Sequence, residues 1–343
     1  MRWSSGSVRR APDLRASRIG LLSALLCGVM GCPAAADIAY VTCQNGDALS
    51  VIDTGRGTEI ARWPLPGKPA GVAVGLDGSV YTVSPDNKAV RRLSQAGTVL
   101  AEARLDGGPI GIALDAARDR VLVSDWYNAR IWVLNAHSLK EEARLITGAA
   151  PAGLALSDDG RFLASADRDA DQVSIFDAET LSLRHRADVG TRPFGLRFAP
   201  DGRLFVANVG TNDLSVINPD QGQVIATVPV GQRPYGVAFA RGRAFVSNQY
   251  ADTVSVIDLA SLAPVGLIEV GEYPEGIDAP ADGSRIAVAN WCDYTLTLFD
   301  SDSLSVVETI ETADGPRAFG LFLTGDPQSH PLPLLSERCS PSP

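Results

Sequence analysis

The sequence predicts an all-β protein, a seven-bladed β-propeller, and three observations lead to this fold class. A unit of about 41 residues recurs seven times after residue 37. Each unit contains four short runs of β type, separated by turns rich in Gly, Asp and Asn. The repeat region starts at a second-strand motif and ends on a first-strand motif, so one blade must combine both ends.

Two independent markers define the repeat. The first is Pro-x-Gly, which begins at Pro69, Pro109, Pro151, Pro193, Pro234 and Pro274, with a stretched copy at 316–320. The second is a polar residue that ends a strand resembling Ser-Val-Ile-Asp, at Asp53, Ser94, Asn135, Asp177, Asn218, Asp258 and Asp300. Because both markers recur in step, we expect one structural unit for each copy.

The copy that starts at Pro193 shows the content of one unit. Its runs predict antiparallel strands at 194–198, 204–207, 214–217 and 224–228, joined by hairpin turns. Four strands in about 40 residues are typical of a propeller blade. Residues 38–42 and 319–323 then predict a closure blade with three strands from the N-terminal part and one from the C-terminal part.

Composition and the first residues bear on compartment and partners. The chain has 40 acidic and 30 basic residues, a net charge of −10, which argues against binding nucleic acid through net charge. Residues 1–36 combine several Arg, an apolar run at 19–30 and small residues, as in a secretory signal peptide. We therefore expect a periplasmic or secreted protein, with acylation of Cys32 as a lipoprotein as the alternative. The propeller should occupy residues 37–324, followed by a Pro-rich tail at 325–343, and no later run is long enough for a transmembrane segment.

Several repeat motifs resemble the YVTN family of β-propeller repeats. The resemblance rests on Tyr-Val-Thr-Cys at 40–43 with 49–54, and on Phe-Val-Ser-Asn at 245–248 with Val-Ser-Val-Ile-Asp at 254–258. It implies a propeller of the exported bacterial or archaeal kind, such as surface-layer proteins, periplasmic propellers and relatives of amine dehydrogenase subunits. Cys43 departs from the family's Asn, and the motifs specify the fold better than an activity.

Most of the repeating residues have a structural explanation. The Asp or Asn that ends the third strand should accept hydrogen bonds from the following turn. The Gly of Pro-x-Gly should lie where the innermost strand packs most tightly, since a side chain would be crowded there.

The candidate site is the rim of the channel on the face that carries the connections between strands four and one and between strands two and three. There the later copies replace small residues by large polar or aromatic ones. The candidate residues are Arg192, Phe194, Arg233, Tyr235, Tyr273, Glu275, Arg317, Asn208, Asn248, Asn290 and Trp291, with Asp125 and Trp126 across the ring. Guanidinium groups favour a carboxylate or other anion. The alternative is that these Arg side chains pair with Glu275 or Asp278 and hold blades together.

Signals for catalysis are weak. His137, His185 and His330 are scattered and form no metal or triad pattern. Propeller lactonases resembling this architecture use a channel metal held by Glu, Asn and Asp, types that Glu275, Asn208, Asn248 and Asn290 supply. We predict no cofactor and no metal ligand set, and keep a divalent metal in the channel as an alternative.

The cysteines predict one disulfide. Cys43 and Cys292 occur in equivalent turns of neighbouring blades, so we expect them to be bridged after export, with two free thiols as the alternative. The state of Cys339 is left open.

Together these features favour a monomeric, non-catalytic propeller that binds a small anionic ligand or a protein partner at the channel rim. A metal-dependent lactonase-like hydrolase and a propeller subunit of a periplasmic dehydrogenase complex are the alternatives.

Overall fold

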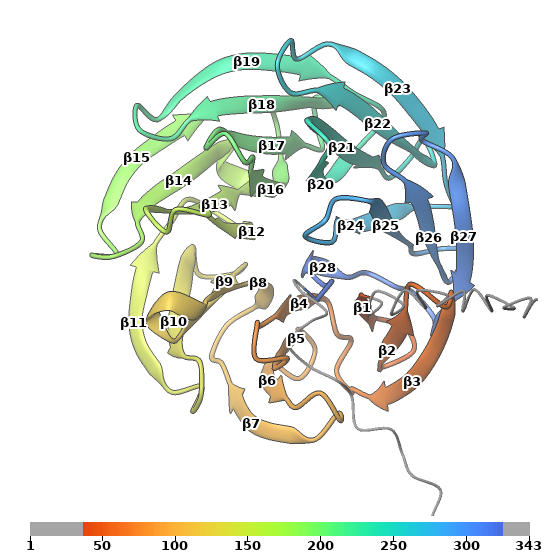
Figure 1. Ribbon diagram of the computed structural model, residues 1–343. Coiled ribbons are helices and arrows are strands. Elements are labelled where there is room, and N and C mark those ends of the chain that lie inside the picture. Colours follow the sequence, from red (N-terminus) through yellow and green to blue (C-terminus); the bar gives the residue numbers. More distant parts are fainter. Residues whose placement is uncertain (1–36, 325–343) are drawn as a thin grey trace, which may run out of the picture. The chain divides into compact units, whose positions relative to one another are not determined.

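The computed structural model describes residues 37–324, which form sheets arranged around a central axis (Figure 1). Within these residues the only helical segments are two single 3-10 turns, η1 (Ala116–Arg118) and η2 (Arg168–Ala170). The predicted signal peptide at 1–36 and the tail at 325–343 lie outside the described residues. No helix in the described part is long and apolar enough to cross a membrane.

Six blades each contain four consecutive strands. Blades 1 and 2 consist of β4 (Gly71–Val74), β5 (Val80–Ser84), β6 (Ala89–Leu93), β7 (Val99–Arg104), and β8 (Pro109–Asp115), β9 (Arg120–Asp125), β10 (Arg130–Asn135), β11 (Glu141–Ile146). Blades 3 and 4 consist of β12 (Pro151–Leu156), β13 (Phe162–Asp167), β14 (Gln172–Asp177), β15 (Leu183–Asp188), and β16 (Pro193–Phe198), β17 (Leu204–Asn208), β18 (Asp213–Asn218), β19 (Gln223–Pro229). Blades 5 and 6 consist of β20 (Pro234–Ala240), β21 (Arg243–Asn248), β22 (Thr253–Asp258), β23 (Pro264–Glu269), and β24 (Pro274–Asp278), β25 (Arg285–Asn290), β26 (Thr295–Asp300), β27 (Val306–Glu311).

Neighbouring strands within these blades are antiparallel, and the first strand of each blade lies innermost (Figure 1). The four runs predicted for the copy at Pro193 are confirmed as β16 to β19, with ends that differ by at most one residue. The middle strands carry the core: β17 and β25, for example, are buried on both faces except at one end residue of β25. The outermost strands alternate between exposed and covered residues, as expected for strands with one face toward solvent.

Blade 7 joins the two ends of the described chain. It contains β1 (Ile38–Cys43), β2 (Ala48–Asp53) and β3 (Thr58–Pro64), and residues 315–324 supply its inner strand. Antiparallel bridges join Ala39 to Leu323 and Cys43 to Pro316. Between these bridges the stretched Pro-x-Gly copy leaves the ladder, and β28 (Phe319–Leu321) pairs in parallel with β4 of blade 1. The predicted closure is therefore confirmed, and its inner strand connects two blades.

The inner strands of adjacent blades pack at the Gly of Pro-x-Gly. A Cβ added at Gly153 would lie 2.6 Å from the carbonyl oxygen of Phe194 in the next blade. Gly195 faces the carbonyl of Tyr235 in the same way, and more closely. Neither glycine has a positive φ, so the glycine is required by this close approach and not by backbone conformation.

Hydroxyl groups on three second strands reinforce this contact. Thr42 Oγ1 donates to the Ala70 carbonyl of the next blade at 2.7 Å and accepts the N–H of Ala318 in its own blade at 3.1 Å. Ser124 and Ser247 bond in the same way to the carbonyls of Ala152 and Glu275, each at 2.7 Å. One side chain thus ties its own inner strand to the inner strand of the next blade.

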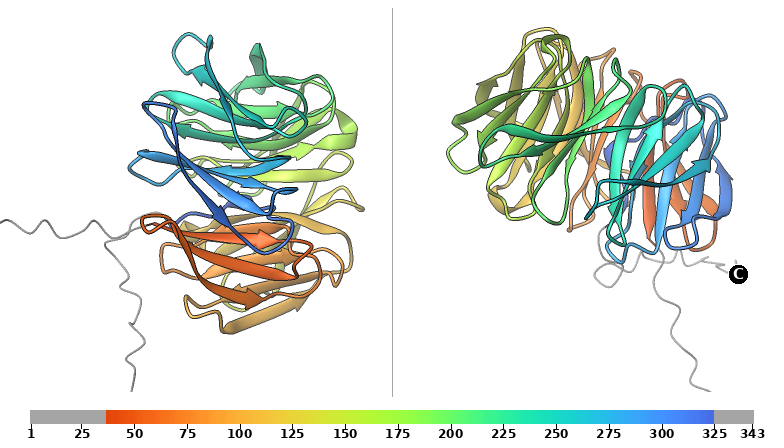
Figure 2. Two further views of the ribbon diagram at one scale, coloured as in Figure 1. Left: turned by 90° about the vertical axis from the view of Figure 1, so that its right-hand side faces the viewer. Right: turned by 90° about the horizontal axis from the view of Figure 1, so that it is seen from above.

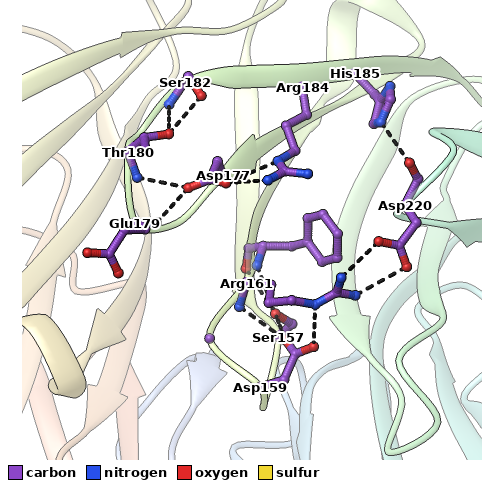
Figure 3. Close-up of polar contacts among 12 residues, drawn as sticks. Ser157, Asp159, Arg161, Asp177, Glu179, Thr180, Ser182, Arg184, His185 and Asp220 are labelled. Carbon is purple, nitrogen blue, oxygen red and sulfur yellow. Dashed lines mark hydrogen bonds and ion pairs between the residues drawn. The ribbon is translucent and has the colours of Figure 1, made fainter.

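The polar residues that end the third strands cap the following turns, as predicted. Asp177 Oδ1 accepts the N–H groups of Glu179 and Thr180 at 3.1 and 2.8 Å (Figure 3). The equivalent Asn218 accepts from Asp220 and Gln221. These residues are therefore structural.

Replacing Thr42 by Val should lower the free energy of unfolding by about 1–3 kcal/mol, because the buried N–H of Ala318 loses its acceptor. Thr82 offers a matched control, since its buried hydroxyl has no hydrogen-bond partner among the described residues. Thr82→Val should therefore leave stability unchanged or raise it. Urea unfolding of both variants measures this, and equal losses would contradict the assigned role of Thr42.

Candidate functional site

The upper face of the propeller is defined here as the face that carries the connections between strands four and one and between strands two and three. The lower face carries the remaining turns, and the side view in Figure 2 shows the strands running between the two faces. Two sets of residues surround the channel on the upper side. One set is the residue x of Pro-x-Gly, and the other directly follows each second strand.

Aromatic side chains close the channel below the upper face. Phe194 and Tyr235 have ring centroids 4.5 Å apart, and Phe319 lies 5.0 and 5.6 Å from them. All three are buried, with exposed fractions of 7, 3 and 6%. Ala152 and Val209 complete this cluster, which we call the aromatic plug. Phe194 and Tyr235, predicted as rim residues, therefore point inward as its main parts.

A polar network borders the plug at blades 5 to 7. Arg317 donates from Nη2 and Nε to the Tyr235 hydroxyl at 2.8 and 3.1 Å, and from Nη1 to Gln44 Oε1 at 3.0 Å. Its Nε also lies 3.2 Å from Glu275 Oε2 as an ion pair. Gln249 Nε2 donates to Glu275 Oε1 at 2.8 Å. For Arg317 the alternative interpretation is thus correct: this Arg pairs with Glu275 and joins blades.

Burial controls the electrostatics of this network. It raises the pKa of the Glu275 carboxyl, against the opposing effects of Arg317 and Gln249. For Arg317, burial is the largest effect and disfavours the charged form, but Glu275 and the tyrosines beside it together outweigh burial, so the pKa of Arg317 stays above its usual value. Burial also raises the pKa of Tyr235, which remains a neutral phenol that accepts from Arg317.

Arg192 and Arg233 are placed differently, because their backbones are fixed and their side chains are not ion-paired within residues 37–324. Each has a positive φ, 56° and 52°, directly before the Pro of its repeat. The N–H of Arg192 donates to Asp171 Oδ1 at 2.7 Å, and that of Arg233 to Asn212 Oδ1 at 2.8 Å. The Arg233 guanidinium lies over the Tyr250 ring at 4.2 Å, and Arg192 is exposed.

A row of aromatic rings continues from Arg233 along the upper face. Tyr250 and Tyr273 are 5.5 Å apart, and Tyr273 and Trp291 are 5.7 Å apart. Burial, followed by the nearby Glu275 carboxyl, raises the pKa of Tyr273 to about 12. The Nε1 of Trp291 is buried and donates no hydrogen bond to any described residue. We call Arg192, Arg233 and this aromatic row the upper rim site.

Several other predicted site residues do not reach this rim. Asn208, Asn248 and Asn290 are fully buried. Their amide nitrogens donate within their own blades, for example from Asn208 to Asp213 Oδ1 at 2.7 Å and from Asn248 to Ser255 Oγ at 2.9 Å. Asp125 is likewise buried and accepts the N–H of Gly108. The three Asn side chains bond to polar side chains at or beside the third strand of their own blade, and Asp125 bonds to the backbone of the preceding connection, which explains why the position is polar in several repeats.

Trp126 lies across the ring from the upper rim site. It is tilted against Phe194 of the plug at 6.1 Å, and the guanidinium of Arg168 lies 5.4 Å from its ring. Arg168 is ion-paired with Asp169. On this side of the mouth the Arg168 guanidinium therefore already has a carboxylate partner, unlike Arg192 and Arg233.

The metal implied for propeller lactonases would take oxygen ligands from Glu275, Asn208, Asn248 and Asn290. Glu275 is ion-paired with Arg317 and accepts a hydrogen bond from Gln249. The three Asn residues donate through their amide nitrogens within their blades, whereas their buried Oδ1 atoms have no hydrogen-bond partner among the described residues. Across residues 37–324 no group of three His, Cys, Asp or Glu is arranged to hold a metal. His185 instead contacts the carbonyl of Asp220 at 3.0 Å (Figure 3), and His330 lies outside the described residues.

The predicted Cys43–Cys292 disulfide is not formed, since both cysteines of the described part are free thiols. Cys43 points into the blade core, where its thiol donates to the Val41 carbonyl at 3.4 Å. Cys292 is exposed in the turn before β26. The prediction from similar positions in neighbouring blades was therefore wrong, because the Cys43 side chain is buried and the Cys292 side chain is exposed. Cys339 lies outside the described residues.

Sequence reasoning missed two kinds of residue. Gln44 and Gln249 follow second strands and bind the Arg317–Glu275 pair, but a lone Gln in a turn gives no signal. Arg197 is the second case, because Ala occupies its repeat position in four blades, at Ala73, Ala113, Ala155 and Ala238. That departure from the repeat was a readable signal.

Comparisons with known proteins agree on the fold. A family profile described as "Lactonase, 7-bladed beta-propeller" matches residues 118–239, about a third of the chain. The comparison with curated protein sequences gives no match.

Solved structures show the same architecture at low identity. Hydrazine synthase from Kuenenia stuttgartiensis superposes with a TM-score of 0.65 at 16% identity, over 74% of this chain and 89% of that chain. A functionally unknown protein from Desulfotomaculum acetoxidans gives 0.71 at 16% identity, over 84% and 99%. Dihydro-heme d1 dehydrogenase NirN in complex with DHE gives 0.63 at 16% identity, over 83% and 74%. At this identity the likeness shows the fold alone.

Replacing Arg317 by Met should cost about 3–5 kcal/mol at pH 7.5, because Glu275 loses its counter-charge in a buried position. A carboxyl whose folded-state pKa is raised stabilises the fold below its unfolded pKa, and this stabilisation is lost as pH rises through the folded-state pKa. The variant should therefore recover part of its loss at pH 5.

Unfolding curves at the two pH values measure this recovery. The double variant Arg317→Met, Glu275→Gln serves as control and should show no such recovery relative to the native protein. A loss of equal size at pH 5 and pH 7.5 in the single variant would contradict the assignment.

Proposed function

We propose that this propeller is a binding scaffold whose upper rim site holds a small ligand with a carboxylate and an aromatic or apolar body. The observation that carries the proposal is the pair Arg192 and Arg233, whose guanidinium groups have no carboxylate partner among the described residues. The chain as a whole has a net charge of −10 and pairs many of its Arg side chains. Two unpaired guanidiniums on such a surface favour an anionic ligand.

The neighbouring groups suit the rest of such a ligand. Tyr250 and Tyr273 lie beside the Arg233 guanidinium and offer aromatic surface to such a body. A protein partner that presents an acidic side chain next to an aromatic residue would use the same groups.

A second candidate, a lactone hydrolase, has the profile match over residues 118–239 in its favour. Against it, Glu275, the carboxylate at the mouth, is already ion-paired with Arg317. Elemental analysis of purified protein separates the two, because a stoichiometric divalent ion would favour the hydrolase. A third candidate function, a subunit of a redox complex, is supported only by the distant structural similarity to hydrazine synthase and dihydro-heme d1 dehydrogenase NirN.

The compartment belongs to the same proposal. The signal-peptide pattern at 1–36 and the YVTN-like repeats both support an exported protein. An exported scaffold would meet its anionic ligand outside the cytoplasm. Fractionation of cells that express the full chain tests this part independently of ligand binding.

Changing Arg233 to Ala should weaken carboxylate binding at least tenfold and change the free energy of unfolding by less than about 1 kcal/mol, because its side chain lacks an ion-pair partner. A panel of aromatic and aliphatic carboxylates, screened by titration calorimetry, provides the probe.

Arg241→Ala is the matched control. Arg241 lies in the lower-face turn of the same blade, and its substitution removes the same charge as Arg233→Ala. It should leave binding unchanged. If Arg233→Ala binds the carboxylate as tightly as the native protein, or if it destabilises the fold by several kcal/mol, the upper rim site is structural.

A further inference from the structure

A cavity opens on the lower face, on the other side of the aromatic plug from the upper rim site. Its volume is about 290 Å³, and inner strands of all seven blades contribute to its wall. The lining side chains are largely aliphatic, with Leu154, Leu196 and Ile277 among them, and Tyr235 and Phe319 of the plug line its inner end. The side chains of this lining are therefore mainly apolar, and backbone of the inner strands lies between them.

Apolar side chains also surround its mouth. Leu76, in the turn before β5, has an exposed fraction of 74%, and Leu321 of β28 one of 49%. Exposed leucines at the entrance of an apolar cavity leave hydrophobic surface in contact with water, which an apolar ligand would cover. The channel thus offers a favourable place for a hydrocarbon chain.

One charged side chain stands in this apolar wall. Arg197, at a repeat position where four blades have Ala, reaches from β16 past β20 to Asp278 on β24, with Nη1 2.8 Å from Oδ1. Asp278 already accepts the N–H groups of Ala279, Phe322 and Leu323. The carboxylate is therefore well satisfied by backbone donors, and it tethers the guanidinium at the channel wall.

The guanidinium keeps unused donors. Within residues 37–324, the Arg197 guanidinium donates one hydrogen bond, to Asp278. The Arg197 side chain is 25% exposed. A guanidinium has five N–H donors, and Arg197 lines the cavity, so donors other than the one bonded to Asp278 are available to a ligand there. Asp158 lies at the same mouth but is exposed, so solvent and salt screen its charge.

We propose that the lower channel binds a medium-chain aliphatic carboxylate, with its chain toward the aromatic plug and its carboxylate on Arg197. A cavity of about 150 Å³ accommodates benzene, so 290 Å³ suits a chain of roughly ten carbons. The side chain at position 197 provides the head-group contact, and the aliphatic wall provides the length preference. This site is independent of the upper rim site, because the plug lies between them.

Titration of the full chain with decanoate, below the concentration at which it forms micelles, tests this proposal. We expect saturable binding to the lower channel. Arg197→Met should weaken it at least tenfold, and Ala113→Leu, which adds volume inside the cavity, should weaken it to a similar extent without touching Arg197. Decylamine, with a cationic head on the same chain, should bind at least tenfold more weakly than decanoate.

Two control variants separate this site from other effects. Arg161→Met removes a guanidinium from the lower face outside the channel, where Arg161 bridges Asp159 and Asp220 (Figure 3), and should leave decanoate binding unchanged. Because decanoate also carries the carboxylate that the upper rim site would take, the titration is repeated in Arg233→Ala, where binding to the lower channel should persist; this distinguishes failure here from failure of the proposed function. The proposal is overturned if the native chain shows no saturable binding, if both channel variants bind normally, or if binding appears only after removal of residues 325–343.

Discussion

The inner strands of neighbouring blades lie so close together that they touch through backbone atoms, with no room for a side chain at the point of contact. At Gly153 and Gly195 the missing Cβ leaves room for the carbonyl of the following blade. Ser124 and Ser247 then add a hydrogen bond to the same type of carbonyl. Because every blade needs both neighbours for this packing, no blade is complete until the C-terminal strand has closed the ring.

The same contact explains why the channel has two different ends. Since the glycine fixes the strand at the axis, the residue before it points to the upper side of the channel and the residues after it line the lower side. Phe194 and Tyr235 before the glycine meet as the aromatic plug, while Leu196 and Arg197 after it line the lower channel. A repeat that is uniform in its backbone can in this way carry two unlike sites.

The fold could be predicted from the sequence because each repeat contains residues that are required by local structure. Pro-x-Gly reports the close approach of inner strands, and Asp177 with its equivalents reports a capped turn. Site residues were harder to predict. The sequence indicates the position of each residue in its repeat, but it does not indicate where the side chain points or which groups it contacts. Arg317 and Arg233 occupy related loops, yet one is buried against Glu275 and the other lies over Tyr250. The incorrect Cys43–Cys292 bridge has the same origin.

The measurement that tests the closed ring most directly is the thermal unfolding of two truncated chains. Removal of residues 316–343 deletes the inner strand of blade 7 together with its pairing to β1 and β4. The ring account predicts that this chain loses its cooperative transition, whereas removal of 325–343 alone keeps it. A chain ending at residue 315 that unfolds with an unchanged transition temperature would contradict the closure on which this structure depends.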